Sequence, residues 1–256
     1  MEPAEVRLVA FDLDGTLSES KSSISQDMAW ALARLMGLRQ VAIISGGRFQ
    51  QFDNQVLSLL PAGAPLGNLH LLPTCGSRYL KHDGDGWAEI YIRELTVDER
   101  GRATASLIRR AKELGYWEPD AVVAGERIED RGSQITYSAL GQLATPADKR
   151  AWDPSGVKRH TLRDAVAADV PDLAVAAGGA TSIDITRRGV DKAYGLMQLS
   201  QQTDVPLTAM LFIGDRTEPG GNDYPVVQLG VATIPVADWD ETLSVITRLC
   251  ERIEEK

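Results

Sequence analysis

Two short apolar runs, separated by about two hundred residues, each end in carboxylates. Leu8-Val9-Ala10-Phe11 precedes Asp12-Leu13-Asp14-Gly15-Thr16, and Ala209 to Ile213 precedes Gly214-Asp215. Runs of this length indicate strands buried on both faces, as in a parallel sheet. Ligands of open α/β sheets bind at the carboxyl ends of the strands, so we expect Asp12, Asp14 and Asp215 to meet at one sheet edge.

Three carboxylates at one edge predict a site for Mg²⁺, which prefers oxygen ligands and binds one or two carboxylates together with substrate phosphate. Each cluster alone is a weaker signal. Asp-x-Asp-Gly-Thr also suits a turn, and Asp-Gly also ends a strand as a hairpin. The shared strand context favours a phosphoryl-transfer site in which one of Asp12 and Asp14 attacks and the other manages a proton.

A third apolar run, Val41 to Ile44, leads into Ser45-Gly46-Gly47-Arg48. The Ser45 hydroxyl is a donor, and the glycines let backbone N–H groups approach an anion closely. We therefore interpret this segment as a phosphate-binding loop. A plain strand-to-helix turn is the alternative.

Lys192 lies at the start of a predicted amphipathic helix that ends before Val205-Pro206. Positive charge is unfavourable at a helix N-terminus, so this position indicates a function. The alternative is an ordinary solvated lysine. Asp191 suits the N-cap of the same helix.

In this order, Asp12-x-Asp14-x-Thr16, Ser45, Lys192 and Gly214-Asp215 with Asn222-Asp223 resemble the four motifs of the haloacid dehalogenase superfamily. The interruption from Arg216 to Gly221 resembles eukaryotic-type phosphomannomutases and other type IIB capped phosphatases. The resemblance covers the whole chain. It implies an α/β fold with a Rossmann-like core, a parallel sheet with helices on both faces, and an inserted α+β cap.

The resemblance also implies a role for each candidate residue. Asp12 forms an aspartyl phosphate, Asp14 acts as acid and base, and Lys192 holds phosphate oxygens. The implied Mg²⁺ ligands are Asp12, Asp14 and Asp215, with Asn222 and Asp223 in support. The candidate substrate-binding residues are Thr16, Ser45, Gly46, Lys21, Arg131, Lys149, Ser182 and Asp184.

Two inserted segments carry the last of these candidates. The segment 131–141 looks like a cap strand with a phosphate-binding arginine, and 178–185 looks like its sugar-binding neighbour. Taken without the resemblance, Ile135 to Tyr137 is an ordinary alternating strand. Ser182 is then a surface residue, and Asp184 is equally a turn residue or a ligand contact.

Three positions depart from the phosphomannomutase pattern, because Lys21, Gln142 and Lys149 stand where that family has arginines. Lysine lacks the bidentate fork of arginine, and glutamine lacks the charge. A second phosphate would be held less firmly unless Arg150, Arg127 or Arg48 compensates. We therefore predict a sugar-phosphate phosphatase. The alternatives are a phosphohexomutase that interconverts hexose 1- and 6-phosphates, and a non-catalytic sugar-phosphate sensor.

The domain boundaries follow from a change of pattern after the turn signal His82-Asp83-Gly84-Asp85-Gly86. We predict a catalytic core of residues 1–86 and 189–256, and an inserted cap of residues 87–188. The alternating segment Trp87 to Ile92 and a helix from Glu99 to Leu114 would open the cap.

Composition agrees with an enzyme of this kind. A chain of 256 residues with 43% hydrophobic content can bury a sizeable core, and a net charge of −9 argues against a nucleic-acid or anionic-membrane surface. Cys75 and Cys250 give no disulfide framework, residues 1–7 lack the pattern of a signal peptide, and no apolar run suffices to span a bilayer. We predict a cytoplasmic enzyme whose partner is a phosphorylated sugar. The resemblance to phosphomannomutases also implies a homodimer that forms through the cap.

Overall fold

The structure is a computed structural model that describes residues 5–255. The chain forms two compact units. The core unit comprises the residues up to Ile92 and those from Asp191 onward, and the inserted unit comprises Arg93–Val190. Residues 1–4, which belong to the segment assessed for a signal peptide, lie outside the described residues. Within 5–255 no helix is long and apolar enough to cross a membrane.

The core unit is built on a seven-stranded sheet with the order β11-β10-β1-β2-β3-β4-β5. The strands from β11 to β3 are parallel, and β4 and β5 are antiparallel additions. The strands are β1 (Leu8–Phe11), β2 (Gln40–Ile44), β3 (Leu69–Leu72), β4 (Arg78–His82), β5 (Trp87–Ile92), β10 (Met210–Gly214) and β11 (Ala232–Pro235).

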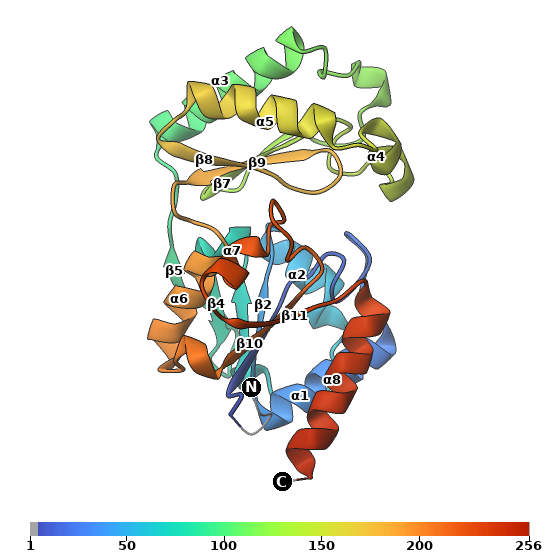
Figure 1. Ribbon diagram of the computed structural model, residues 1–256, viewed down its shortest axis with the longest axis vertical. Helices are drawn as coiled ribbons and strands as arrows, with labels where there is room; N and C mark the ends of the chain where they lie inside the picture. Colours follow the sequence, from blue (N-terminus) through green and yellow to red (C-terminus); the bar gives the residue numbers. More distant parts are fainter. Residues whose placement is uncertain (1–4, 256) are drawn as a thin grey trace. The chain divides into compact units, whose positions relative to one another are not determined.

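Helices cover both faces of this sheet, as the α/β prediction requires (Figure 1). Val9 and Phe11 of β1 pack in one buried cluster with α1, α2 and α8, whereas Leu8 and Ala10 pack in another with α6 and α7. The predicted α/β class is confirmed. The helices are α1 (Gln26–Leu38), α2 (Phe49–Gln55), α6 (Lys192–Thr203), α7 (Tyr224–Gln228) and α8 (Trp239–Glu254), with short 3-10 turns at Leu57–Leu59, Leu66–Asn68, Thr74–Gly76 and Leu207–Ala209.

The register of the parallel strands decides which residues share the carboxyl edge of the sheet. Phe11 lies opposite Ile43 on one side and Ile213 on the other. The residues that follow these three positions therefore emerge at the same edge. Asp12, Ser45 and Asp215 are among them.

The inserted unit is an antiparallel sheet of order β6-β7-β9-β8 with helices α3 and α5 packed on one face. Ile135 and Tyr137 of β7 point into the buried cluster under these helices, and a capping box of Thr96 and Glu99 starts α3. The elements are α3 (Val97–Glu113), β6 (Ile128–Asp130), β7 (Gln134–Ser138), α4 (Pro146–Trp152), α5 (Val157–Asp169), β8 (Leu173–Ala177) and β9 (Ser182–Arg187), with a 3-10 turn at Asp120–Val122.

The boundaries between the units differ from those that we placed by sequence. β5 pairs with β4 in the core sheet, so Trp87–Ile92 belongs to the core unit and not to the insert. An alternating strand pattern does not say which sheet the strand joins, because that depends on its pairing partner. The return to the core unit comes at Asp191, two residues after the predicted position.

One close backbone contact sets how α6 approaches the sheet. A Cβ atom added to Gly195 would lie 2.5 Å from Ile44 Cδ1 and 3.1 Å from Gly76 Cα, and Gly76 itself has a φ of +82°. Glycine at both positions therefore lets α6, which begins with Lys192, pack directly against the 3-10 turn that contains Gly76.

We expect Gly195→Ala to lower the free energy of unfolding by about 1–3 kcal/mol, because the added methyl group overpacks this contact. Gly37→Ala in α1 is the matched control, since nothing lies within 4 Å of its added Cβ. That change should be neutral or stabilise by up to about 1 kcal/mol. Urea unfolding followed by circular dichroism measures both, and equal effects would contradict the packing argument.

A second prediction concerns His70 on β3, whose ring nitrogens lie 2.8 Å from Tyr79 Oη and 3.0 Å from Gln40 Oε1. Burial lowers the pKa of His70 from 6.5 to about 4. Between pH 6.5 and about pH 4, His70 is therefore protonated in the unfolded chain and neutral in the folded chain. The stabilising contribution of neutral His70 is therefore complete above pH 6.5 and is lost as the pH falls, at a cost of up to about 3 kcal/mol.

The measurement compares the unfolding free energies of wild type and His70→Gln at pH 7 and pH 4.5. The wild type should lose more stability than the variant over this interval. His160→Gln, an exposed position in α5, should follow the wild type. A His70→Gln profile parallel to that of the wild type would contradict the prediction.

Candidate active site

A buried ion-pair network lies at the carboxyl edge of the core sheet. Asp12 directly follows β1, and its backbone N–H donates to Ile213 O at 3.0 Å. Lys192 Nζ donates to Asp12 Oδ1 at 2.6 Å and to Asp223 Oδ1 at 2.5 Å. The Lys192 side chain is 1% exposed, so the alternative of a solvated lysine is wrong.

Asp191 caps α6 by accepting from the Tyr194 N–H at 2.9 Å, which fixes the start of the helix.

Asp215 completes a group of three carboxylates with Asp12 and Asp223. One ligand atom from each of the three lies within 4.8 Å of the others. Asp215 Oδ1 is buried and has no hydrogen-bond partner. When ionised, the three carboxylates outnumber the Lys192 ammonium and leave two negative charges in excess. This donor set fits a divalent cation that prefers oxygen.

The pKa values reflect the same crowding of charge. Burial raises the pKa of Asp12 well above its usual value, against the opposing effect of Lys192. Burial, and then the charge of Asp223, raise the pKa of Asp215. For Lys192 burial acts to lower the pKa, but Asp12 and Asp223 together outweigh it and hold the pKa above the usual value. A bound cation would favour the ionised carboxylates.

Two glycines make room for these carboxylates. Gly15 has a φ of +93°, and a Cβ there would lie 2.4 Å from Asp215 Oδ2. A Cβ on Gly214 would lie 2.5 Å from Asp223 Oδ2. The Asp-x-Asp-Gly and Gly-Asp motifs therefore need glycine because a neighbouring carboxylate occupies the space of a side chain.

The segment between Asp215 and Asp223 folds back on itself. The Arg216 N–H donates to Asp223 Oδ2, and the Asp223 N–H donates to Arg216 O, both at 3.1 Å. This closure returns Asp223 to the side of Asp215. Asn222, predicted beside it in a supporting role, has a buried Oδ1 without a hydrogen-bond partner.

Asp14 has different surroundings. Its Oδ1 accepts from the Lys21 N–H at 2.6 Å, and its Oδ2 accepts from Gln51 Nε2 at 2.9 Å. Among the described residues, the carboxylate group that suits a metal contains Asp223 and not Asp14. The structure thus brings together Asp12 and Asp215, two of the three predicted metal ligands. The third, Asp14, is held by the Lys21 N–H and by Gln51 of α2.

Three predicted phosphate-binding residues lie in the core unit near these motifs. Thr16 is fully buried, and its Oγ1 has no hydrogen-bond partner. Ser45 is buried, and its Oγ accepts from the Gly47 N–H at 3.2 Å. Gly46 follows Ser45 in the loop after β2 and is half-buried. The unpartnered Thr16 hydroxyl is a donor that a phosphate oxygen would satisfy.

The candidates of the inserted unit have polar partners within that unit. Arg131 pairs with Glu129 at 2.5 Å, and both side chains are less than a tenth exposed. Asp184 Oδ1 accepts from Thr136 Oγ1 at 2.7 Å and from Gln134 Nε2 at 2.9 Å. Ser182 pairs with Ser138 in the sheet, and Lys149 Nζ donates to Gln142 O at 2.9 Å.

Sequence reasoning missed several of these partners. Gln134 and Thr136 alternate with the apolar residues of β7, so the strand pattern does contain their signal. Gln51 and Gln55 stand four residues apart on α2 and share a helix face. Glu129 carries no comparable signal, because its pairing with Arg131 depends on how β6 and β7 meet.

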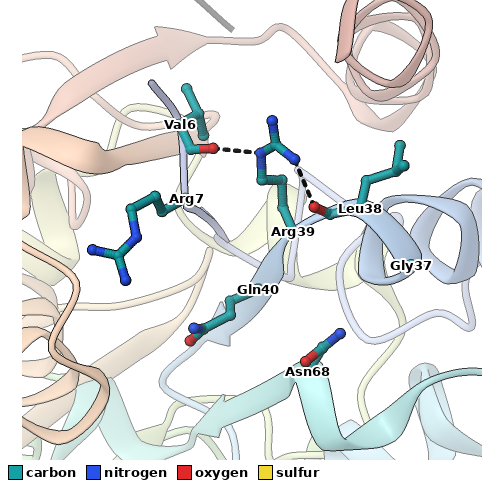
Figure 2. A pocket seen from close by; sticks show the side chains of 7 residues that line it. All are labelled: Val6, Arg7, Gly37, Leu38, Arg39, Gln40 and Asn68. Carbon is teal, nitrogen blue, oxygen red and sulfur yellow. Dashed lines mark hydrogen bonds between the residues drawn. The ribbon is translucent and has the colours of Figure 1, made fainter. Parts of the chain in front are cut away.

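A cavity of about 450 Å³ lies at the opposite end of the parallel strands (Figure 2). It is lined by Arg7, Arg39, Gln40 and Asn68, which stand before or at the start of β1, β2 and β3. Arg39 donates to Val6 O and to Leu38 O, as the dashed lines show. Its guanidinium therefore ties the end of α1 to the chain before β1 and lies away from the carboxylates.

Comparison with known proteins identifies the family. Residues 121–250, just over half of the chain, match the sequence model described as eukaryotic phosphomannomutase. The chain belongs to this family. It is 24% identical to the phosphomannomutase of Saccharomyces cerevisiae over 94% of this chain and 93% of the relative, and 26% identical to that of Schizosaccharomyces pombe over the same shares.

Solved structures agree with this member of the phosphomannomutase family in fold. Plasmodium falciparum IMP-nucleotidase gives a TM-score of 0.71 at 14% identity, over 95% of this chain and 70% of the other. Aspergillus fumigatus trehalose-6-phosphate phosphatase gives 0.55 at 16% identity, over 97% and 94%. The family match and the phosphomannomutase relatives confirm the predicted resemblance to phosphomannomutases and the prediction of an enzyme. The solved structures confirm the fold.

The cluster of Asp12, Asp215 and Asp223 leads to a prediction about how Mg²⁺ changes the thermal stability of this phosphomannomutase-family protein. Saturating Mg²⁺ should raise the melting temperature, because a cation that binds only the folded state stabilises it by about 2.7 kcal/mol at a hundred times its dissociation constant. Asp215→Asn should abolish this shift. Its metal-free melting temperature should be equal or higher, because the change removes one negative charge from three neighbouring carboxylates.

Asp85→Asn, an exposed turn position of the core unit, is the matched control and should keep the full shift. Differential scanning fluorimetry with and without chelator measures all three proteins. An unchanged Mg²⁺ shift in Asp215→Asn would contradict the assignment of Asp215.

Proposed function

We propose that this protein is a Mg²⁺-dependent sugar-phosphate phosphatase that works through an aspartyl phosphate on Asp12. The observation that carries the proposal is the buried Asp12 carboxylate, held by Lys192 beside Asp215 in a chain of the phosphomannomutase family. Phosphoryl transfer needs a placed nucleophile and compensation of negative charge more than any further covalent chemistry. This arrangement supplies both.

The residues present fit Mg²⁺, as the unpartnered Asp215 Oδ1 indicates. Asp12, Asp215 and Asp223 are the side chains that would hold the ion. Of the two roles predicted for Asp14, metal ligand and acid–base group, the proposal keeps the second. When bound, Mg²⁺ supplies charge neutralisation at the transferring phosphoryl group.

In the first step a carboxylate oxygen of Asp12 attacks phosphorus. The new O–P bond forms as the bond between phosphorus and the sugar oxygen breaks, and the Asp14 carboxyl group gives its proton to the departing oxygen. Lys192 restrains the Asp12 carboxylate, while the hydroxyls of Thr16 and Ser45 donate to phosphoryl oxygens. The products of this step are the free sugar and the aspartyl phosphate.

In the second step water attacks the same phosphorus. The Asp14 carboxylate takes a proton from the water as its oxygen bonds to phosphorus, and the bond to Asp12 breaks. Inorganic phosphate leaves, and both aspartates return to their starting states. Asp14 thus serves as acid and then as base in one turnover.

The inserted unit supports water as the acceptor. Gln142 has no charge where the family resemblance calls for arginine, and Lys149 donates to the backbone oxygen of Gln142. Arg127 does not replace them, because it donates to Glu118 O at 2.7 Å and stacks on Trp117 at 4.1 Å from the ring centroid. A weak site for a second phosphate favours release of the sugar over its return as a bisphosphate.

A mutase is the second candidate, favoured by relatives named phosphomannomutase that match almost the full chain. A hydroxyl of a sugar monophosphate would then replace water as the acceptor. The sensor alternative predicts loss of the nucleophile or the acid, and neither Asp12 nor Asp14 is lost.

In this proposal the inserted unit acts as a cap that selects the sugar, with Arg131, Ser182 and Asp184 as substrate contacts. Lys21 and Lys149 stay proposed phosphate contacts. The predicted homodimer through the cap and the cytoplasmic location also stay predictions.

Phosphorus NMR tests the proposal with Mg²⁺, mannose and glucose monophosphates and a trace of hexose bisphosphate. We expect inorganic phosphate to accumulate, and Asp12→Asn to reduce turnover by at least about 100-fold, since the change removes the nucleophile. Asp85→Asn should match the wild type. Interconversion of the 1- and 6-phosphates would establish the mutase instead, and turnover by Asp12→Asn at the wild-type rate would refute the aspartyl phosphate.

A further inference from the structure

The surroundings of the Asp14 carboxylate point to an additional residue that serves the reaction. One oxygen is held by a backbone group, the Lys21 N–H at 2.6 Å, in a residue with a φ of +60°. The other oxygen is held by a side chain, the Gln51 amide at 2.9 Å. These two donors approach different oxygens, so together they fix the plane of the carboxylate and not only its position.

Helix α2 brings this amide to Asp14. Phe52, next to Gln51, is fully buried in the core cluster and anchors the helix. Gln55, one turn later, donates mainly to Ser22 O at 2.7 Å and approaches Asp14 Oδ1 only at 3.5 Å. Gln51 therefore provides the well-formed side-chain hydrogen bond to Asp14, and Gln55 ties the helix to the chain that leads away from it.

Gly47 leaves the space in which the Gln51 amide lies. A Cβ added to Gly47 would be 2.2 Å from Gln51 Oε1 and 2.6 Å from its Cδ. The φ of Gly47 is not in the positive range, so a side chain at this position would displace the Gln51 amide and would not strain the backbone. The same residue donates its N–H to Ser45 Oγ. Gln51 is thus packed between the loop that follows β2 and the carboxylate that follows β1.

We propose that Gln51 is a positioning residue for acid–base chemistry at Asp14. This inference rests on the proposed function, in which Asp14 protonates the departing sugar oxygen as its bond to phosphorus breaks. Among the described contacts, Gln51 touches neither Lys192 nor the cluster of Asp12, Asp215 and Asp223. Its effect therefore falls on proton transfer by Asp14 and not on the attack by Asp12. A neutral amide holds the Asp14 carboxylate without adding a charge next to the cluster of Asp12, Asp215, Asp223 and Lys192.

A leaving-group comparison separates these two effects. The sugar oxygen leaves as a poor alkoxide and needs the proton, whereas p-nitrophenolate leaves without one. We compare wild type with Gln51→Leu, which keeps the size and removes the donor. Glucose 6-phosphate is followed by steady-state kinetics, and the first release of p-nitrophenolate from p-nitrophenyl phosphate is followed by rapid mixing. The burst isolates attack by Asp12 from the later attack of water.

We expect Gln51→Leu to lower kcat for the sugar phosphate by about 10- to 100-fold, with KM changed by less than about threefold. The burst rate with p-nitrophenyl phosphate should change by less than about threefold. Gln51→Glu, which keeps the shape and replaces the donor with a second carboxylate, should show the same selectivity. Gln50→Leu is the matched control, because Gln50 is exposed on the same helix and bonds only to Asp53 and Asn54 among the described contacts. It should match the wild type with both substrates.

An equal loss with both substrates would overturn the inference, because Gln51 would then act through the fold or through Asp12. No loss in either Gln51 variant would also overturn it. Both outcomes leave the proposed function intact, since the wild type still turns over the sugar phosphate. A wild type that hydrolyses no phosphate monoester would instead refute the proposed function, and the inference with it.

Discussion

The structure of the site depends on one buried interaction, the contact of Lys192 with Asp12 and Asp223. These residues come from the start of α6, the end of β1 and the segment before α7, so the ammonium joins three parts of the chain. A buried charge without a partner is strongly destabilising, and each member of this group therefore requires the others. Gly214 leaves space for Asp223 of this contact, and Gly15 leaves space for Asp215 beside it.

The two aspartates of the first motif have separate environments although they are two residues apart. Asp12 is buried among charges, where Lys192 restrains it and Asp215 and Asp223 surround it. Asp14 is half-buried and is held by a backbone N–H and by the Gln51 amide. Different surroundings are what one nucleophile and one acid–base group need, because the first must stay ionised and the second must exchange a proton. The division of roles that we propose follows this difference.

The surroundings of the polar side chains in the inserted unit bear on the proposed choice of substrate. The sheet of this unit places apolar side chains under α3 and α5 and polar ones such as Thr136 and Asp184 on the other face, as strand alternation requires. Arg131 is already paired with Glu129, and Gln142 carries no charge. The proposed preference for water over a second sugar phosphate depends on Gln142 and Lys149, which stand where the family resemblance calls for arginine.

The apolar runs before Asp12, Ser45 and Asp215 were enough to predict three strands, since such short runs suit buried strands and parallel strands share a carboxyl edge. The sequence also marked Lys192, because a cation at a helix start is unfavourable without a partner. Three contacts emerge from long-range folding: Asp223 joins Asp12 and Asp215 in place of the Asp14 side chain, Gln51 holds Asp14, and Trp87–Ile92 completes the core sheet. Local patterns report the periodicity and end of an element, whereas these contacts depend on which elements fold against each other across long separations in the chain.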